Sequence, residues 1–117
     1  MSVFTREEVL LGNERFLQLC AFVEQTQVNL RSGSEGYDQR QIVHSCGAPA
    51  CLLGHAQKKW PDRAFVHGFD EEEFFAINGT DWFEIFSQEG CDNAGTDWRK
   101  AVAFVRQFVA DRAVSSL

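Results

Sequence analysis

The sequence predicts a mainly α fold, a compact single domain of four to five helices that spans residues 1–117. Three observations predict it. Apolar residues recur every three or four positions through residues 16–23 and 98–113, as they do along one face of a helix. Residues that cap helix N-termini, such as Thr5 and Asp70, stand before the periodic segments. The length of 117 residues is that of one domain, and 11 phenylalanines supply a core of aromatic rings.

The first helix begins at a capping box, in which Thr5 is the N-cap and Glu8 stands three residues later. Gly12 is expected to interrupt this helix, and the neighbouring Asn13 can cap a second start. Apolar residues then form one face until the helix ends near residues 26–28; they are Phe16, Leu17, Leu19, Cys20 and Val23. We expect Cys20 to be a small buried side chain of that face rather than a functional thiol.

Residues 29–41 predict a surface loop, because they contain glycines and serines but almost no apolar side chains. Tyr37, the only tyrosine of the chain, is expected to tuck this loop back against the domain. The β-branched residues within 41–44 follow as a short strand or an extended lead-in. Residues 63–69 could pair with them, which leaves room in the fold for one very short β-pair.

One stretch, residues 44–55, brings together two cysteines, two histidines and a proline. Pro49 suits the first turn of a helix, because its missing N–H would have no partner there. We therefore expect a helix from Pro49 to about Trp60, stopped by Pro61. Gly54 lies inside this helix at a cost of about 1 kcal/mol relative to Ala, so we expect a close approach of another backbone there.

Two short helices are predicted next. Asp70 caps the first, which runs through Phe75 and ends at Asn78–Gly79. Thr80 caps the second, which runs through Phe86.

The last helix is opened by Thr96 and Asp97, after a loop over residues 88–95. Its apolar residues keep the three-and-four spacing without a gap, which makes this helix the most regular element of the chain. They are Trp98, Ala101, Val102, Val105, Phe108, Val109 and Ala113. Phe104 lies off this face and is expected to contact either a second helix or a partner.

The net charge of -6 is unevenly distributed along the chain. Residues 64–98 contain no lysine or arginine but nine of the 17 acidic residues. Such a surface repels nucleic acid and attracts a basic protein surface. The candidate partner-binding residues are Asp70, Glu71, Glu72, Glu73, Asp81, Trp82 and Glu84. The plainer interpretation is that the acids cap helix N-termini and keep the protein soluble.

The sequence contains no apolar run that approaches the ~20 residues of a membrane-spanning helix. Residues 5–8 are acidic where the basic start of a secretory signal would lie. We therefore expect a cytoplasmic protein, in a bacterium or in an infected host cell, that does not bind membranes. In that compartment the four cysteines are expected to be thiols or metal ligands rather than disulfides.

Three interpretations of residues 44–55 compete. In the structural one, Cys46 and Cys51 pack around a tight turn and bind nothing. In the second, Cys46, Cys51 and His55 bind zinc, because zinc prefers thiolate and imidazole ligands and residues four apart share a helix face. A fourth ligand would come from His44, His67 or Cys91.

In the third interpretation, Cys51 is a catalytic nucleophile in the first turn of a helix, where the helix dipole and free N–H groups stabilise a thiolate. His44 or His67 would then be the base. Cys46 and Cys51 could instead form a redox disulfide. The sequence shows no phosphate-binding glycine loop and no Ser-His-Asp elbow pattern, so an enzyme is the less favoured class.

Residues 46–56 read Cys-Gly-Ala-Pro-Ala-Cys-Leu-Leu-Gly-His-Ala. This stretch resembles a motif of small uncharacterised bacterial and phage proteins, Cys-Gly-Thr-x-x-Cys-(Ile/Leu/Val)-x-Gly-(His/Trp)-Ala, and the resemblance extends over residues 13–88. Ala48 stands in place of the usual Thr, which removes a hydroxyl from that position. Members with Trp at the position of His55 lack the imidazole, which speaks against a metal site. The resemblance implies a bacterial, prophage or phage source and brings no activity with it.

These observations favour a small acidic, non-enzymatic protein-interaction module that binds a basic protein partner and needs no cofactor. The resemblance to phage proteins adds the hypothesis that the protein inhibits a host defence protein, since small phage proteins often bind and disable host proteins. The alternative is a thiol- or zinc-dependent protein centred on Cys46, Cys51 and His55. A homodimer is compatible with either function.

Overall fold

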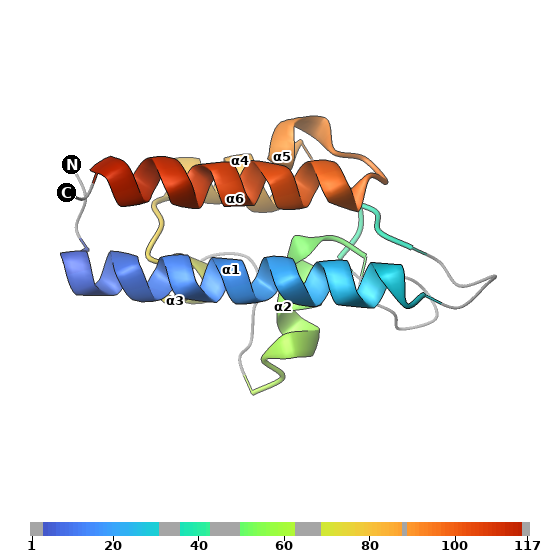
Figure 1. The fold of residues 1–117 in the computed structure, drawn as a ribbon, viewed down its shortest axis with the longest axis horizontal. Helices are drawn as coiled ribbons and strands as arrows, with labels where there is room; N and C mark the ends of the chain where they lie inside the picture. The colour runs from blue at the N-terminus through green and yellow to red at the C-terminus, as the bar shows by residue number, and fades with distance from the viewer. Residues whose placement is uncertain (1–3, 31–35, 43–49, 63–68, 88, 116–117) are drawn as a thin grey trace.

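The computed structural model describes residues 4–30, 36–42, 50–62, 69–87 and 89–115. It is mostly helical, as the sequence predicts, with α1 (Arg6–Val28), α2 (Leu52–Lys59), α3 (Phe69–Phe75), α4 (Gly79–Phe86), α5 (Gly90–Asn93) and α6 (Trp98–Ser115). α1 and α6 lie side by side and run in opposite directions (Figure 1). α2 and α3 pack against α1, and α4 and α5 connect them to α6. The part of the chain that the structure describes contains no β-strand.

α1 begins at the predicted capping box. The Thr5 hydroxyl accepts a hydrogen bond from the Glu8 backbone N–H at 3.1 Å, and the Glu8 carboxylate accepts one from the Thr5 N–H at 3.0 Å. The backbone hydrogen bond from Thr5 lowers the pKa of the Glu8 carboxyl. The helix ends at Val28, within the predicted range.

The predicted interruption at Gly12 is wrong, because α1 runs unbroken through it. Gly12 lies where α1 and the end of α3 approach each other closely. A Cβ atom at this position would lie 2.2 Å from the Phe75 carbonyl oxygen. The packing of α1 against α3 therefore requires a glycine here. Gly54, for which the sequence predicts a close approach, is buried in α2.

Aromatic rings form the centre of the core, as the composition predicts. Phe16 of α1 stacks on Phe75 of α3 with ring centroids 4.3 Å apart, and Phe108 of α6 meets Phe16 edge-on at 5.7 Å. Trp60, which follows α2, packs edge-on against Phe74 at 4.7 Å. Stacked and edge-on pairs are the geometries that aromatic rings prefer, so these contacts connect α1, α3, α6 and the residue that follows α2 through their rings.

An arginine of α6, Arg112, holds the C-terminal end of α3. Its guanidinium donates hydrogen bonds to the Phe75 carbonyl oxygen at 3.0 Å and to the Ala76 carbonyl oxygen. It also donates to the Asn13 side-chain oxygen of α1 at 2.7 Å, and burial lowers its pKa to about 10. The Arg15 guanidinium of α1 donates a hydrogen bond to the Phe74 carbonyl oxygen of α3 at 2.9 Å. The last carbonyl groups of a helix lack intrahelical partners and carry partial negative charge, so both guanidinium groups stabilise this end.

The N-terminal ends of the short helices differ from the predicted ones. Asp70 lies inside α3 rather than at its N-cap. α4 is capped by Asn78, whose side-chain oxygen accepts a hydrogen bond from the Asp81 N–H at 2.8 Å, and not by Thr80. Neighbouring polar residues offer several cap candidates, and the packing of the helix selects among them.

The loop predicted over residues 88–95 contains a tight left-handed turn, α5. Cys91 and Asp92 have positive φ angles of 51° and 56°. A Cβ atom at Gly90 would lie 2.6 Å from the Ile85 carbonyl oxygen, so the turn begins with a close return of the backbone. Cys91 thereby enters the core, where its sulfur lies 3.5 Å from the Ile85 carbonyl oxygen.

The predicted β-pair falls largely on residues 43–44 and 63–68, which lie outside the described residues. Of its first strand the structure describes Ile42, whose carbonyl oxygen accepts a hydrogen bond from the Ala50 N–H at 3.0 Å. The Ala50 carbonyl oxygen in turn accepts one from the Asp38 N–H at 2.9 Å. The first of these hydrogen bonds places Ile42 beside Ala50, two residues before the start of α2.

α6 confirms the predicted apolar face. Its buried members are Ala101, Val102, Val105 and Val109, and Trp98 and Phe108 are partly buried against the core. Phe104, for which the sequence leaves a partner contact open, also packs against the core. The periodicity of one segment was sufficient to identify this face, because α6 buries one continuous side against α1.

Candidate functional site

The stretch with the greatest number of reactive side chains is described only over residues 50–55, and His44 and Cys46 lie outside the described residues. α2 begins at Leu52, later than predicted, so Cys51 occupies the N-cap position instead of the first turn. Burial raises the pKa of the Cys51 thiol, although neighbouring backbone N–H groups lower it. Burial therefore works against the thiolate that the catalytic interpretation requires, and the neutral thiol is the favoured form.

Both ring nitrogens of the buried His55 have partners within the protein. Nδ1 lies 2.7 Å from the Cys51 carbonyl oxygen, which can only accept, so Nδ1 carries the proton. Nε2 then accepts a hydrogen bond from the Gln27 amide nitrogen at 3.1 Å. The Tyr37 ring stacks on the imidazole with centroids 5.8 Å apart. His55 thus joins α1 to α2, and a zinc ion could bind it only by displacing one of these hydrogen bonds.

A buried polar network that the sequence did not predict surrounds this histidine. The Gln27 side-chain oxygen accepts a hydrogen bond from the Tyr37 N–H at 2.9 Å, and the Tyr37 hydroxyl donates to the Gln39 side-chain oxygen. The Gln39 amide donates to the carbonyl oxygens of Ile85 at 3.0 Å and Ser87 at 2.8 Å. Residues 36–42 form a loop, as predicted, but Tyr37, Asp38 and Gln39 are buried rather than at the surface, and the inward position of Tyr37 is confirmed. The presence of the single tyrosine in a polar segment was the only sequence signal for this inward position.

Three of the four cysteines, Cys20, Cys51 and Cys91, are free thiols buried in the core. Burial raises the pKa of Cys20 to about 12 and raises that of Cys91 as well. These thiols stay protonated at neutral pH, which agrees with the buried role predicted for Cys20. Among the described residues, His, Cys, Asp and Glu side chains form no group of three that could hold a metal ion. A zinc site that includes Cys46 lies partly outside them and stays a prediction.

The candidate partner-binding residues of α3 do not all reach the surface. Glu71 is only 1% exposed, so the expectation that it contributes to a charged surface is corrected. Glu72 is half-buried and Glu73 is exposed. The side chain of Asp70 lies outside the described part of the structure. Because α3 packs against α1, the Glu71 side chain of the acidic run lies in the interior.

α4 supplies a further exposed part of the acidic segment. Glu84 is exposed, Asp81 and Trp82 are half-buried, and the Trp82 ring lies 6.3 Å from the Phe86 ring. Phe83, which is not among the predicted partner-binding residues, is 54% exposed. Its position in the helix pattern could have revealed it, because it falls off the side of α4 that is buried. α4 therefore presents one phenylalanine beside acidic side chains.

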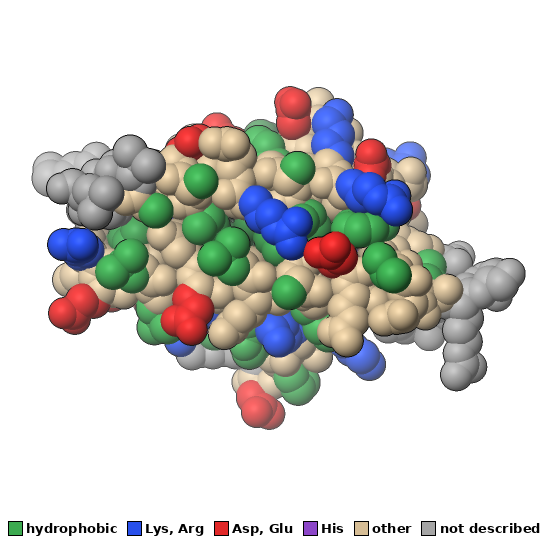
Figure 2. Space-filling model, in the orientation of Figure 1, with side chains coloured by type: hydrophobic (Ala, Val, Ile, Leu, Met, Phe, Trp, Pro, Cys, Tyr) green, Lys and Arg blue, Asp and Glu red, His purple; other side chains and the backbone are tan. Residues whose placement is uncertain are grey.

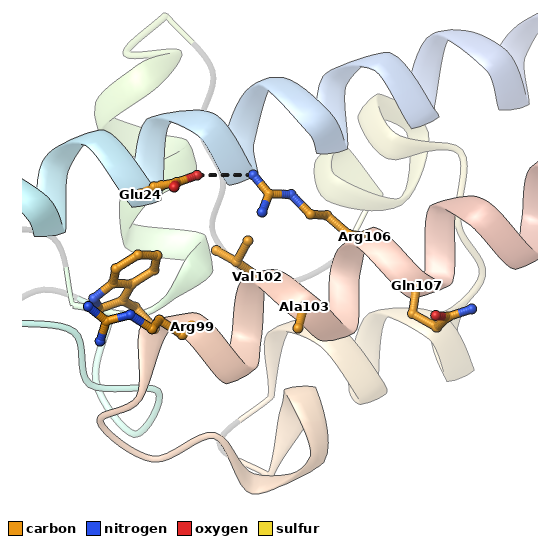
Figure 3. A pocket seen from close by; sticks show the side chains of 7 residues that line it. Glu24, Arg99, Val102, Ala103, Arg106 and Gln107 are labelled. Atoms are coloured by element: carbon orange, nitrogen blue, oxygen red, sulfur yellow. Dashed lines mark hydrogen bonds and ion pairs between the residues drawn. The ribbon is translucent and has the colours of Figure 1, made fainter.

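A groove of about 530 Å³ lies between the second half of α1 and the first half of α6 (Figure 3). Its lining includes Glu24 from α1 and Trp98, Arg99, Val102, Ala103 and Arg106 from α6. Arg106 and Glu24 point toward each other across the groove and form an ion pair at 3.1 Å. Both side chains are about half exposed, so the pair contributes less than about 1 kcal/mol. This groove was not predicted from the sequence.

A scan against protein-family models and searches of curated proteins and of solved structures find no match to this chain. Within the described residues, neither the two long helices nor the short ones combine the length and the apolar character that a membrane span requires. The geometry of the chain's own side chains is therefore what points to a function.

Proposed function

We propose that this protein is a small acidic, non-enzymatic interaction module that binds a protein partner with a basic surface. The exposed Phe83 carries this proposal, because it lies on α4 next to Glu84, in a stretch of chain without lysine or arginine. An aromatic side chain beside carboxylates suits a partner that offers an apolar pocket ringed by lysines or arginines.

The two kinds of side chain contribute differently to such a contact. Complete burial of a phenylalanine side chain contributes on the order of 2 kcal/mol, and about half of this remains available at the half-exposed Phe83. The carboxylates of Glu73 and Glu84 steer the encounter with a basic partner and add specificity more than affinity. The same charges repel the phosphate backbone, so the proposal does not include direct binding of nucleic acid.

The state of the reactive side chains that the structure describes, Cys51 and His55, supports a non-enzymatic function. A catalytic thiol has to be ionised and accessible, and burial works against both at Cys51. The His55 imidazole is held at both nitrogens and packs under Tyr37, where it has a structural role. The proposed function accordingly needs neither a cofactor nor a metal ion.

The resemblance of residues 46–56 to a motif of bacterial and phage proteins supports a finer proposal. The partner would be a host protein in the bacterial cytoplasm, and its inhibition would serve a phage or prophage against host defence. A small acidic surface suits this role, because it can occupy a basic site that the host protein uses for another ligand.

The test compares tagged proteins as baits in a bacterial lysate: the wild type, a Phe83→Asp, Glu84→Lys double variant, and Leu11→Asp as the control. Leu11 is 45% exposed on α1, so the control introduces a carboxylate at similar exposure away from α4. We expect a basic protein that the wild type and the control capture and that the double variant loses. With the purified partner, the double variant should raise the Kd at least about tenfold. Equal binding by the double variant would refute the role of α4.

A further inference from the structure

We propose that the outer face of α1 and α6 binds a second copy of this chain, with α1 of each copy lying along α6 of the other. This surface is separate from α4 and goes beyond the function proposed above. Figure 2 shows the face formed by the two long helices: hydrophobic side chains are distributed over both, and acidic and basic side chains meet near its centre.

α1 carries a second apolar stripe besides the one that forms the core. Leu10, Leu17 and Val28 are exposed to 47%, 47% and 64%, and Ala21 between them is also exposed. Intervals of seven, four and seven residues place these four side chains on one side of the helix. The buried side of α1, which includes Phe16, faces another direction. The described part of a single copy therefore leaves this stripe uncovered, and the alignment of its four members on one side of α1 gives a second copy a continuous apolar contact.

α6 presents small side chains beside the groove. Ala103 and Ala110 are exposed and lie seven residues apart, which is two helical turns or about 10.5 Å along the axis. Leu10 and Leu17 have the same spacing on α1. When α1 of one copy lies along α6 of the other, both leucines can rest above both alanines at once. The small alanine side chains let the two helices approach closely and give the leucine side chains room.

The exposed charges on the two helices complement each other. α1 exposes four glutamates and α6 exposes three basic residues; they are Glu7, Glu8, Glu14 and Glu24, and Arg99, Lys100 and Arg106, of which Glu24 and Arg106 pair with each other within one copy. Contact between α1 and α6 of different copies brings opposite charges together, whereas contact between two α1 helices would bring like charges together. Two exposed charges depart from this pattern, the basic Arg6 of α1 and the acidic Asp111 of α6. They lie near the start of α1 and near the end of α6, which are neighbours in the antiparallel pair (Figure 1). A two-fold axis parallel to the helices places these two opposite one another as well.

The test is sedimentation equilibrium of the full chain, whose monomer mass is 13.3 kDa. We expect the wild type at twice this mass at tens of micromolar concentration. Leu17→Glu replaces a leucine by a carboxylate at two symmetry-related places, so we expect it to raise the dimer Kd about 100-fold, or about tenfold per place. Ala110→Glu is expected to have the same effect from the α6 side. Leu11→Glu is the matched control, because Leu11 is exposed on another side of α1, and it should keep the wild-type Kd.

Leu11, Leu17 and Ala110 are all exposed, so their replacement should leave the fold of one copy unchanged. Circular dichroism measures whether each variant is folded. A wild type that sediments as a monomer at this concentration overturns the proposal. A dimer whose Kd is unchanged in both Leu17→Glu and Ala110→Glu also overturns it. The Phe83→Asp, Glu84→Lys variant should keep the wild-type dimer Kd, so that failure of this interface and failure of the α4 surface are distinguishable.

Discussion

Replacement of Arg112 by methionine tests how the C-terminal end of α3 is held. The guanidinium donates hydrogen bonds to the Asn13 side chain at 2.7 Å, to the Phe75 carbonyl oxygen at 3.0 Å and to the Ala76 carbonyl oxygen. Its central carbon also lies 5.0 Å from the centroid of the Phe108 ring. Methionine keeps the apolar stem that packs on this ring and removes all three hydrogen bonds.

The expected cost follows from these contacts. A hydrogen bond from a charged donor contributes about 1.5–3 kcal/mol, so three of them amount to at least about 4.5 kcal/mol. The substitution also removes the cost of partly burying a positive charge, which is the cause of the lowered pKa of Arg112. We therefore expect the free energy of unfolding to fall by about 3 kcal/mol, below the simple sum of the hydrogen bonds.

Urea unfolding followed by circular dichroism measures this loss. For a slope of about 1.5 kcal/mol per molar urea, a loss of about 3 kcal/mol lowers the midpoint by about 2 M. Arg106→Met is the matched control on the same helix, because it removes only an exposed ion pair with Glu24 and should cost less than about 1 kcal/mol. Arg112→Lys keeps the charge without the planar fork and should fall between the two. Equal midpoints for Arg112→Met and Arg106→Met would refute the reasoning.

Gly12→Ala is expected to lower the free energy of unfolding by about 1–3 kcal/mol, because the new Cβ would lie 2.2 Å from the Phe75 carbonyl oxygen; an unchanged urea midpoint would contradict this close packing. The side-chain hydrogen bond from Arg40 lowers the pKa of Asp38 to about 2, so the ionised carboxylate stabilises the folded state above about pH 4 and loses this effect as the pH falls toward 2. The difference in unfolding free energy between the wild type and Asp38→Asn should therefore shrink across this range, and a constant difference would argue against the ion pair. In a Cys46→Ser variant, the remaining thiols Cys20, Cys51 and Cys91 should react with a thiol reagent only on unfolding, because all three are buried and their pKa values are raised. Rapid labelling of the folded variant would show that at least one of them is accessible.

The two long helices could be predicted because their signals are local. The capping box of Thr5 and Glu8 involves residues three apart, and it places the start of α1 correctly. The buried face of α6, which includes Val102 and Val105, follows from spacing within one segment. Neither signal depends on which other segment of the chain packs against the helix.

The candidate site could not be predicted in the same way. Glu71 belongs to an acidic run that looks like a solvated surface, and only the packing of α3 shows that this position is buried. Gln39 lies in a polar segment typical of a loop, but its amide binds carbonyl oxygens 46 and 48 residues further along the chain. The acidic character of the α4 region was evident from composition, whereas the exposure of Phe83 depends on which side of α4 is covered.

The sequence by itself therefore determined the mostly helical class, the two ends of α1, the buried face of α6 and the burial of Cys20, since periodicity and capping act within one or two turns. Only the tertiary structure decided that Gly12 marks a close approach and that Arg112 reaches the end of α3. It also decided that Leu17 stays outside the core. The physical reason is that burial and hydrogen bonding of a side chain depend on which distant segment packs against it, and that partner is not encoded in the neighbouring residues.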